Sequence, residues 1–282
     1  MATDADIVTS PPRGGDIVRR HRLSTRLWHW INAVTLLIML MSGLMIFNAH
    51  PRLYWGEYGA NFDHAWLEIG QRGGQGFLRI GALQLGTGQW LGAWPDANGI
   101  ERHRAVPYWA TLPSSYSLAD GRVWHLAFAW VLALGLLAYL VRSLVNGHLR
   151  RDIHITRAEW RPAHIWHDIK AHARLRFPTG AGALRYNVLQ KIAYASVLFV
   201  LLPLMIVTGL AMSPGTDAWA PWLTEVFDGR QTARSVHFLC AWGLVAFFVV
   251  HVAMVLLTGP FNELRSIVTG RYRLPRDRSD PA

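Results

Sequence analysis

Four long apolar segments constrain this chain more than any other feature of its sequence. They lie at about residues 27–47, 123–141, 188–212 and 236–258, and each can cross the ~30 Å hydrocarbon core of a bilayer as an α-helix. Pro203 is expected to kink the third helix. Open sheets leave backbone groups unsatisfied in lipid, so we predict an all-α membrane protein, a bundle of four transmembrane helices.

Composition supports this class and excludes several others. Charged residues make up only 16% of the 282 residues, against about 25% in an average soluble domain. A single cysteine, Cys240, excludes a disulfide framework, a thiolate-ligated iron–sulfur cluster and a zinc ribbon. The first 26 residues hold no apolar signal-peptide region, so we expect the first span to act as an uncleaved insertion signal.

The positive charges predict the orientation of the helices. Of the 28 Lys and Arg residues, 20 lie in the N-terminal tail (1–26), the segment Arg142–Lys191 and the C-terminal tail (259–282). The positive-inside rule then places both termini and the loop 142–187 in the cytoplasm of a bacterial cell, with the chain in the inner membrane. The net charge of +10 is therefore read as a topology signal that also suits anionic lipids, and no nucleic acid is expected as a partner.

The two long loops carry separate expectations. The loop 48–122 is periplasmic in this orientation and contains glycine-rich and Trp-rich stretches. A loop of this length is usually functional, so we expect a docking surface there. In the cytoplasmic loop, Trp160–Arg176 reads as an interfacial amphipathic helix. The helical domain is thus expected to span residues 27–258 between two tails.

Histidines inside the apolar segments are the strongest functional signal. Ionisable side chains in membrane helices are costly and suggest function, and four histidines lie there: His29, His125, His237 and His251. His237 and His251 are 14 residues apart, which is ~40° short of four helical turns and ~21 Å along the axis. In the predicted orientation His125 pairs with His237 on the periplasmic side, and His29 pairs with His251 on the cytoplasmic side.

Two imidazoles at each level suit axial ligation of haem iron, whereas zinc needs four ligands or three and a water. The chain has no C-x-x-C-H sequence, so the haems are expected to be b-type. The pair His164 and His167 lacks a third ligand and is a weak metal motif. We therefore predict two haem b groups.

An internal repeat supports this arrangement. The pattern R-x-x-H-x-x-x-A-W occurs at Arg122–Trp130 and again at Arg234–Trp242. Ser42-Gly43-Leu44 in the first helix is matched by Thr208-Gly209-Leu210 in the third. Because Tyr139 and Ala195 occupy the positions that match His251 and His29, the repeat predicts two haems rather than four.

Glycines and arginines near the outer histidines have two open interpretations. Gly43 and Gly209 can let the porphyrin approach the backbone, or they can serve close helix packing. Arg122 and Arg234 are placed to bind haem propionates, or they anchor helix ends.

The whole chain resembles the prokaryotic four-helix di-haem cytochrome b family of the cytochrome b-561 type. The resemblance rests on R-x-x-H-W at Arg26–Trp30, one histidine in the second helix and two histidines 14 apart in the fourth. Members are membrane subunits of nickel–iron hydrogenases, formate dehydrogenases and thiosulfate reductase-type complexes. The segments 48–56, 112–113 and 121–125 look most like the thiosulfate-reductase branch, with its enlarged periplasmic loop.

The resemblance also implies a quinone site. In the formate dehydrogenase branch, Y-N-x-G-Q-K opens the third helix and lines a quinone pocket. Here Tyr186–Lys191 matches, except that Leu189 replaces the glycine. Asn187 would donate a hydrogen bond to a quinone carbonyl, and His251 could supply a second contact. The alternative is that Asn187 is a polar cap of the helix.

The function expected is electron transfer across the inner membrane between a periplasmic oxidoreductase, with molybdopterin enzymes favoured, and the quinone pool. A hydrogenase cytochrome b subunit and a stand-alone cytochrome that oxidises a small reductant such as superoxide are the redox alternatives. A homo-oligomer is compatible with the sequence. A non-haem iron hydroxylase would need several histidine boxes, and a histidine-using transporter would need broken helices at the midplane.

Overall fold

The computed structural model describes residues 14–95, 99–175, 180–184 and 186–275; the ends of both predicted tails, 1–13 and 276–282, lie outside them. The described chain forms two compact units, each treated by itself below. The terminal unit comprises the described residues of Met1–Trp30, Tyr139–Ser196 and Phe247–Ala282, and the central unit comprises those of Ile31–Ala138 and Val197–Ala246.

Within the part of the chain that the structure describes, four helical segments are long and apolar enough to cross a membrane, which confirms four predicted spans. They are Leu23–Ala49, Leu118–Val145, Gly182–Ala211 and Arg230–Thr258. The first, second and fourth begin four to six residues before the predicted bounds, because their polar ends remain helical beyond the apolar run. They correspond to helix α1 (Leu23–Ala49), helix α2 (Leu118–Val145) and helix α8 (Arg230–Thr258).

The third span is interrupted where the sequence predicts a kink. Helix α4 (Val188–Ser196) runs into a π-helical turn, η4 (Val197–Leu201), and the chain continues as helix α5 (Leu202–Ala211). Pro203 lies in the first turn of α5, where it needs no amide hydrogen. Proline removes an interior helical hydrogen bond and clashes with the preceding turn, and a wider π-turn absorbs that disruption.

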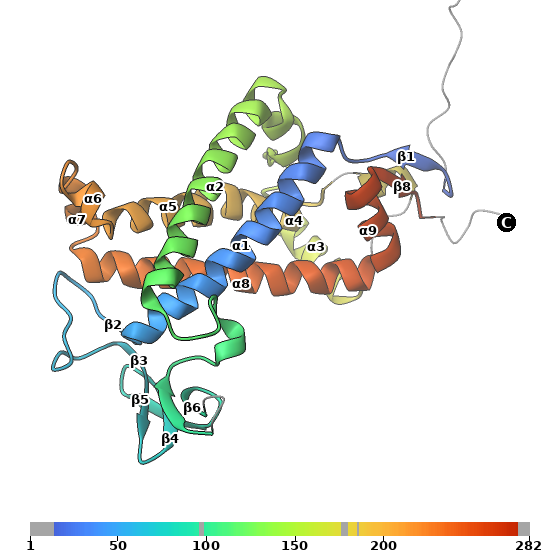
Figure 1. Ribbon diagram of the computed structural model, residues 1–282. Helices are drawn as coiled ribbons and strands as arrows, with labels where there is room; N and C mark the ends of the chain where they lie inside the picture. Colours follow the sequence, from blue (N-terminus) through green and yellow to red (C-terminus); the bar gives the residue numbers. More distant parts are fainter. Residues whose placement is uncertain (1–13, 96–98, 176–179, 185, 276–282) are drawn as a thin grey trace, which may run out of the picture. The chain divides into compact units, whose positions relative to one another are not determined.

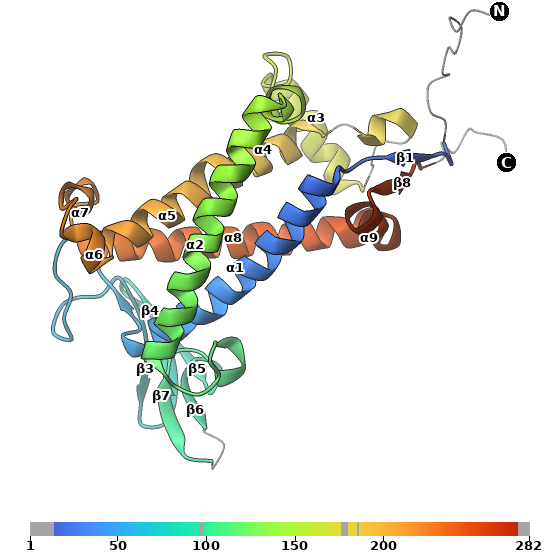
Figure 2. The same cartoon turned by 45° about the horizontal axis from the view of Figure 1, so that its top comes forward.

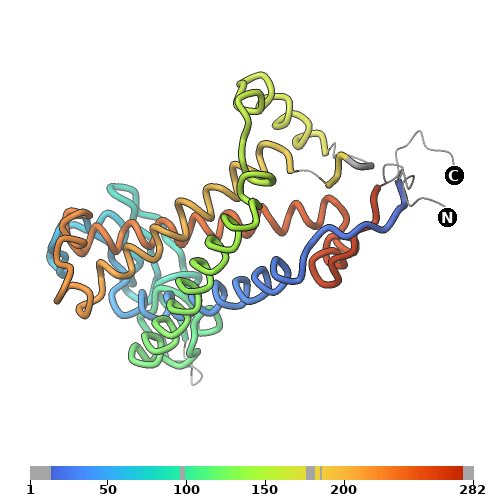
Figure 3. The backbone as a smooth tube through the Cα atoms, turned by 90° about the horizontal axis from the view of Figure 1, so that it is seen from above, coloured from blue at the N-terminus to red at the C-terminus, as the bar shows by residue number. Residues whose placement is uncertain are grey.

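Short elements close the terminal unit. Strands β1 and β8 pair antiparallel, so the first and last described parts of the chain run side by side (Figure 3). Arg20 forms an ion pair with Glu263 at 3.0 Å, and burial together with the charge of Arg20 lowers the pKa of His21 to about 4. The elements are β1 (Ile17–Arg19), η2 (Leu149–Ile153), α3 (Pro162–Ala173), η3 (Gly180–Leu184), α9 (Pro260–Thr269) and β8 (Arg271–Arg273). Helix α3 confirms the helix expected within Trp160–Arg176.

The long loop of the central unit contains β-structure that the sequence reading did not identify. A four-stranded antiparallel sheet has the order β2-β3-β4-β5, and β6 pairs with β7. Both lie beside the C-terminal end of α1 (Figure 1). The elements of this region are β2 (Arg52–Leu53), β3 (Leu67–Arg72), β4 (Gln75–Ile80), β5 (Leu83–Gly88), β6 (Gly92–Pro95), β7 (Glu101–Arg104) and η1 (Tyr108–Ala110).

Glycines make these strands possible. Gly73 and Gly74 have φ of 57° and 76° and form the two-residue turn between β3 and β4, which requires positive φ at both positions. At the start of β6 the backbone lies very close to β4 and to β3. A Cβ built on Gly76 would lie 1.8 Å from the carbonyl oxygen of Leu91, and one on Gly92 would lie 2.1 Å from that of Gly70.

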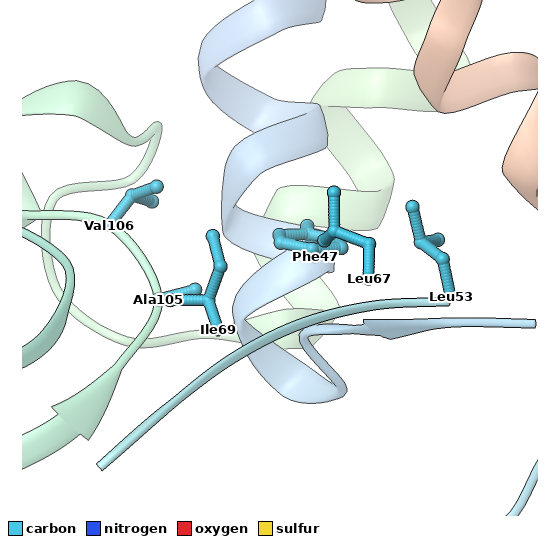
Figure 4. Packing of buried hydrophobic residues seen from close by; sticks show 6 residues of the cluster. All are labelled: Phe47, Leu53, Leu67, Ile69, Ala105 and Val106. Carbon is cyan, nitrogen blue, oxygen red and sulfur yellow. The ribbon is translucent and has the colours of Figure 1, made fainter. Parts of the chain in front are cut away.

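A buried cluster joins the sheet to the end of α1. Phe47 packs 5.0 Å from Phe238 of α8 between ring centroids, and Leu53 is fully buried. Full burial of such a side chain contributes about 1.5–3 kcal/mol. The cluster, shown in Figure 4, consists of Phe47, Leu53, Leu67, Ile69, Ala105 and Val106.

The first turns of α8 fasten the loop that follows α1. Thr232 Oγ1 accepts a hydrogen bond from the amide of Gly56 at 2.6 Å. Ser235 donates to the carbonyl of Tyr54 at 2.6 Å and accepts from the indole of Trp66 at 2.9 Å. Two short helices, α6 (Pro214–Asp217) and α7 (Trp222–Val226), link α5 to α8 (Figure 2). These contacts fix the start of α8 relative to α1 and the sheet.

Candidate functional site: two histidine pairs

The central unit brings His125 and His237 together. His125 projects from α2 and His237 from α8, and their ring centroids lie 6.2 Å apart with 60° between the planes. The terminal unit brings His29 of α1 and His251 of α8 together in the same way, at 6.3 Å and 53°. The imidazoles predicted to pair therefore lie close together, and their role as haem ligands stays a prediction.

Hydroxyl groups hold the central pair. Ser42 Oγ of α1 lies 3.1 Å from Nδ1 of His125, and Thr208 Oγ1 of α5 lies 2.9 Å from Nδ1 of His237. The two hydroxyls belong to the matched tripeptides of the internal repeat. Sequence reasoning noted those tripeptides and missed this role, although the hydroxyl preceding each glycine was the signal.

The glycines of the repeat face the same rings. A Cβ on Gly43 would lie 3.2 Å from Cε1 of His125, and one on Gly209 would lie 3.6 Å from Cε1 of His237. A side chain at Gly43 would press against His125, whereas a methyl group at Gly209 would make ordinary van der Waals contact with His237. In the structure Gly43 therefore makes room for imidazole; the role of both glycines toward a porphyrin stays a prediction.

The two arginines predicted near the outer histidines, Arg122 and Arg234, differ in burial and in contacts. Arg234 is partly buried and donates to the carbonyl oxygens of Arg52 at 3.1 Å and His50 at 2.5 Å. Burial and the charge of Arg234 lower the pKa of His50. Arg122 is exposed at the start of α2. The geometry makes Arg234 an anchor of the loop, and binding of propionates by either arginine stays a prediction.

Aromatic rings surround the terminal pair. Phe247 stacks on His251 at 5.8 Å and 12°, and Trp30 meets the edge of His29 at 5.1 Å. His29 Nδ1 is buried, and no described side chain or backbone group accepts its hydrogen bond. Tyr139, which occupies the repeat position of His251, stacks on Trp28 at 5.3 Å.

Asn187 lies at the start of α4 as a helix cap. Its Oδ1 accepts a hydrogen bond from the backbone amide of Gln190 at 2.9 Å, and its backbone amide donates to Oε1 of Gln190 at 3.2 Å. The two residues therefore form a reciprocal capping box. Its Nδ2 donates to Nε2 of His172 on α3 at 3.1 Å. His172 in turn lies 2.8 Å, through Nδ1, from the carbonyl oxygen of Asp168. Sequence reasoning did not single out His172.

A row of rings connects this cap with the terminal pair. Tyr186 lies 5.3 Å from Tyr194, and Tyr194 lies 6.3 Å from Phe247, which stacks on His251. The row therefore runs from a histidine of the pair to the residue that precedes Asn187. The end of the row away from His251 carries the phenols of Tyr194 and Tyr186, and the amide of Asn187 and the imidazole of His172 follow there.

The donor set fits haem better than a protein-only metal centre. Imidazole nitrogens bind first-row metals at about 2 Å, so two rings on opposite sides of one iron need centroids roughly 6 Å apart. Both pairs have this separation. Across residues 14–95, 99–175, 180–184 and 186–275, no group of three or more His, Cys, Asp or Glu side chains could hold a metal ion. A porphyrin supplies the other four nitrogens that a pair of imidazoles lacks.

Comparison with known proteins identifies the relatives of this chain. The model of a family described as prokaryotic cytochrome b561 matches residues 20–270. That match covers all four spans and all four membrane histidines. No solved structure was found to match the chain.

Three curated relatives show the range of named partners. A probable Ni/Fe-hydrogenase B-type cytochrome subunit of Azotobacter vinelandii is 27% identical over 58% of this chain and 72% of its own length. A putative protein-methionine-sulfoxide reductase subunit YedZ1 of Azospira oryzae is 26% identical over 82% and 87%. A probable Ni/Fe-hydrogenase B-type cytochrome subunit of Cupriavidus necator is 22% identical over 89% and 85%.

Proposed function

Because this chain belongs to the prokaryotic cytochrome b561 family, we propose that it carries electrons through two b-type haems, one per histidine pair. The chain is a membrane b-type cytochrome that transfers electrons. His125 and His237 hold the central haem, and His29 and His251 hold the terminal haem. The observation that carries this proposal is the matched separation of the two ring pairs, 6.2 and 6.3 Å.

Haem and the protein have different roles in this proposal. Haem, when bound, supplies the one-electron chemistry. The four imidazoles hold iron from both sides, and burial in apolar helices together with the neighbouring groups of the ligands sets the potential. We place His125 and His237 toward the periplasm and His29 and His251 toward the cytoplasm, as the positive charges indicate.

Quinone reacts at the terminal unit in this proposal. Asn187 offers a side-chain amide hydrogen to a quinone carbonyl oxygen, and Nε2 of His172 can accept a hydrogen bond from a quinol hydroxyl, in place of the hydrogen bond that the two side chains share at 3.1 Å. The rings from Tyr186 to Phe247 line the approach to His251. Asn187→Ala and His172→Ala should slow haem reduction by a quinol and leave reduction by dithionite unchanged.

The partner we propose is a periplasmic oxidoreductase, and the names of the relatives favour a nickel–iron hydrogenase. The β-structure beside α1 gives such a subunit a surface with exposed aromatic side chains, of which Phe62 is 99% and Trp90 82% exposed. Aromatic residues are enriched where proteins associate. This surface argues against a stand-alone cytochrome that oxidises superoxide.

A second candidate partner is a molybdopterin reductase, favoured by the enlarged loop 48–122. Membranes that contain the native complex distinguish the two. Reduction of the b-type haem by hydrogen gas supports the hydrogenase. Reoxidation of the reduced haem by a sulfoxide or thiosulfate supports the reductase.

Spectroscopy of the purified protein tests the haem assignment itself. We expect a b-type α-band after dithionite reduction and two haems per chain by pyridine haemochrome. His237→Ala should halve the haem content, and the control His103→Ala, on the exposed strand β7, should leave it intact. A chain without the α-band, or an α-band indifferent to His237→Ala, would refute the proposal.

A further inference from the structure

We propose that Ser42 and Thr208 are positioning residues for the central haem, each accepting the Nδ1–H of an axial histidine and thereby orienting its Nε2 toward iron. The inference rests on the proposed function, because it takes His125 and His237 as the axial ligands. It adds two hydroxyl groups that adjust the potential of one haem and leave the other alone.

The direction of these hydrogen bonds follows from the helices. Ser42 donates its hydroxyl hydrogen to the carbonyl of Ile38 at 2.7 Å, and Thr208 donates to the carbonyl of Leu204 at 2.5 Å. Each hydroxyl has only one hydrogen, so its oxygen is left to accept from the imidazole. Both histidines are then held as the neutral tautomer with an unprotonated Nε2, the form that binds a metal.

The arrangement occurs twice, once in each half of the internal repeat. Met39 and Met205 each precede the hydroxyl by three residues, and the two helices share M-x-x-[S/T]-G-L. The backbone carbonyls of Met39 and Met205 also lie 3.2 and 3.3 Å from the hydroxyl oxygens of Ser42 and Thr208. The same neighbours therefore surround both ligands, although the ligands come from α2 and α8.

The glycine that follows each hydroxyl residue lies next to the same imidazole ring. Because Gly43 carries no side chain, His125 can approach α1 closely enough to meet Ser42, and His237 lies at ordinary contact distance from the position that a methyl group would take at Gly209. The hydroxyl sets the orientation of each ring, and Gly43 provides the space for that of His125.

An acceptor on Nδ1 increases electron donation by an axial imidazole. Stronger donation stabilises ferric over ferrous iron, so these hydroxyls should lower the potential of the central haem. His29 of the terminal pair has a buried Nδ1 without an acceptor among the described residues. The terminal haem is therefore expected to keep its potential when Ser42 or Thr208 is changed.

Potentiometric titration of the purified holoprotein tests the inference in Ser42→Ala, Thr208→Ala and the double variant. Removal of both acceptors should shift the ferric–ferrous equilibrium of one haem about tenfold toward ferrous, which is ~59 mV upward for one electron. Each single variant removes only one of the two acceptors, so we expect it to shift the potential less. Ser42→Thr and Thr208→Ser keep the hydroxyl and should titrate like the wild type.

The outcomes separate this inference from the proposed function. If His125→Ala and His237→Ala retain both haems, the ligand assignment fails. If those variants each lose one haem but the alanine variants of Ser42 and Thr208 titrate like the wild type, the hydroxyl role alone is overturned. A lower thermal midpoint without a change in potential, or a Thr208→Ser shift equal to that of Thr208→Ala, would also overturn it.

Discussion

The two histidine pairs have nearly the same ring separation and opposite surroundings. In the central unit, both Nδ1 atoms meet hydroxyl oxygens from neighbouring helices, at 3.1 and 2.9 Å. In the terminal unit, His251 is stacked on Phe247 and His29 has a buried, unpaired Nδ1 within the described residues. One pair is held by polar contacts and the other by rings, so the same residue type has two different chemical environments.

The internal repeat accounts for part of this difference between the surroundings of the two histidine pairs. Both central histidines belong to the repeat R-x-x-H-x-x-x-A-W, and both hydroxyls belong to its companion M-x-x-[S/T]-G-L. His29 and His251 have no repeat partners, since Ala195 and Tyr139 occupy those positions. A repeated hairpin can give both histidines of a pair the same neighbours, whereas the histidines of the terminal pair lie outside the repeat and have different neighbours.

The largest expected effect is the loss of haem, and it tests whether the pairs are separate sites. The double variant His125→Ala/His237→Ala should lose one haem of two, because both changes remove ligands of one iron. His125→Ala/His251→Ala should lose both haems, because each iron loses a ligand. Pyridine haemochrome of the purified proteins measures the ratio. Equal haem content in the two double variants would show that the rings are not paired as proposed.

Removal of Arg234 should come next in size. Arg234→Ala removes one donor from the carbonyls of His50 and Arg52, although the His50 carbonyl still accepts from the amide of Arg52 at 2.8 Å. The loss should therefore not exceed the ~1–3 kcal/mol of one acceptor left without a partner. The central unit should unfold more easily, and the absorbance of the central haem should be lost at lower temperature. Thermal scans at the α-band measure this effect.

Arg122→Ala is the matched control, since Arg122 is exposed. If the arginines mainly bind propionates, both alanine variants should shift haem potentials. If Arg234 mainly anchors the loop, only Arg234→Ala should lower the thermal midpoint. Equal thermal midpoints for the two variants would contradict the anchoring role.

The paired glycines provide a smaller and more symmetric test. Alanine gains about 0.5–1 kcal/mol over glycine in a helix, but Gly43→Ala would place a Cβ 3.2 Å from His125, against 3.6 Å for Gly209→Ala. Crowding at Gly43 costs about 1 kcal/mol. We therefore expect Gly209→Ala to be slightly more stable than the wild type and Gly43→Ala to gain nothing. Loss of haem in both variants would instead indicate that both glycines accommodate the porphyrin.

Features that depend on local spacing could be predicted from the sequence. Apolar runs of about twenty residues identify membrane helices, and a 14-residue interval places His237 and His251 on one face of α8. Pro203 marked the interruption of the third span. Each of these inferences needs only the geometry of a single helix.

Features that depend on tertiary contact could not be predicted in this way. The sheet in the loop 48–122 consists of strands of two to six residues, too short to show a clear alternation. The pair Gly73-Gly74 was a visible turn signal, but the approach of Gly76 to Leu91 was not. Similarly, the sequence suggested a propionate ligand at Arg234, while its loop contacts appear only in the folded chain.

The smallest expected effect concerns pH and should distinguish the units in a different way. In the terminal unit, burial alone would raise the pKa of Glu159, but hydrogen bonds from Lys191 and Thr156 outweigh it and lower the pKa to about 2. Lys191 Nζ lies 2.7 Å from Glu159 Oε1. A carboxyl whose pKa is depressed in the folded state stabilises that state above its unfolded pKa of about 4.3. This contribution is lost as the pH falls from there toward 2.

Thermal unfolding of the protein in detergent, followed between pH 5 and 3, measures the loss. Glu159→Gln removes the titrating group and should flatten that part of the pH profile. The contact connects the segment before α3 with α4, so acid should release the terminal haem before the central haem in the wild type. If the variant retains the acid sensitivity of the wild type, or if the central haem is released first, other carboxyl groups control the acid response. The contrast between the two units would then rest on the hydroxyl groups alone.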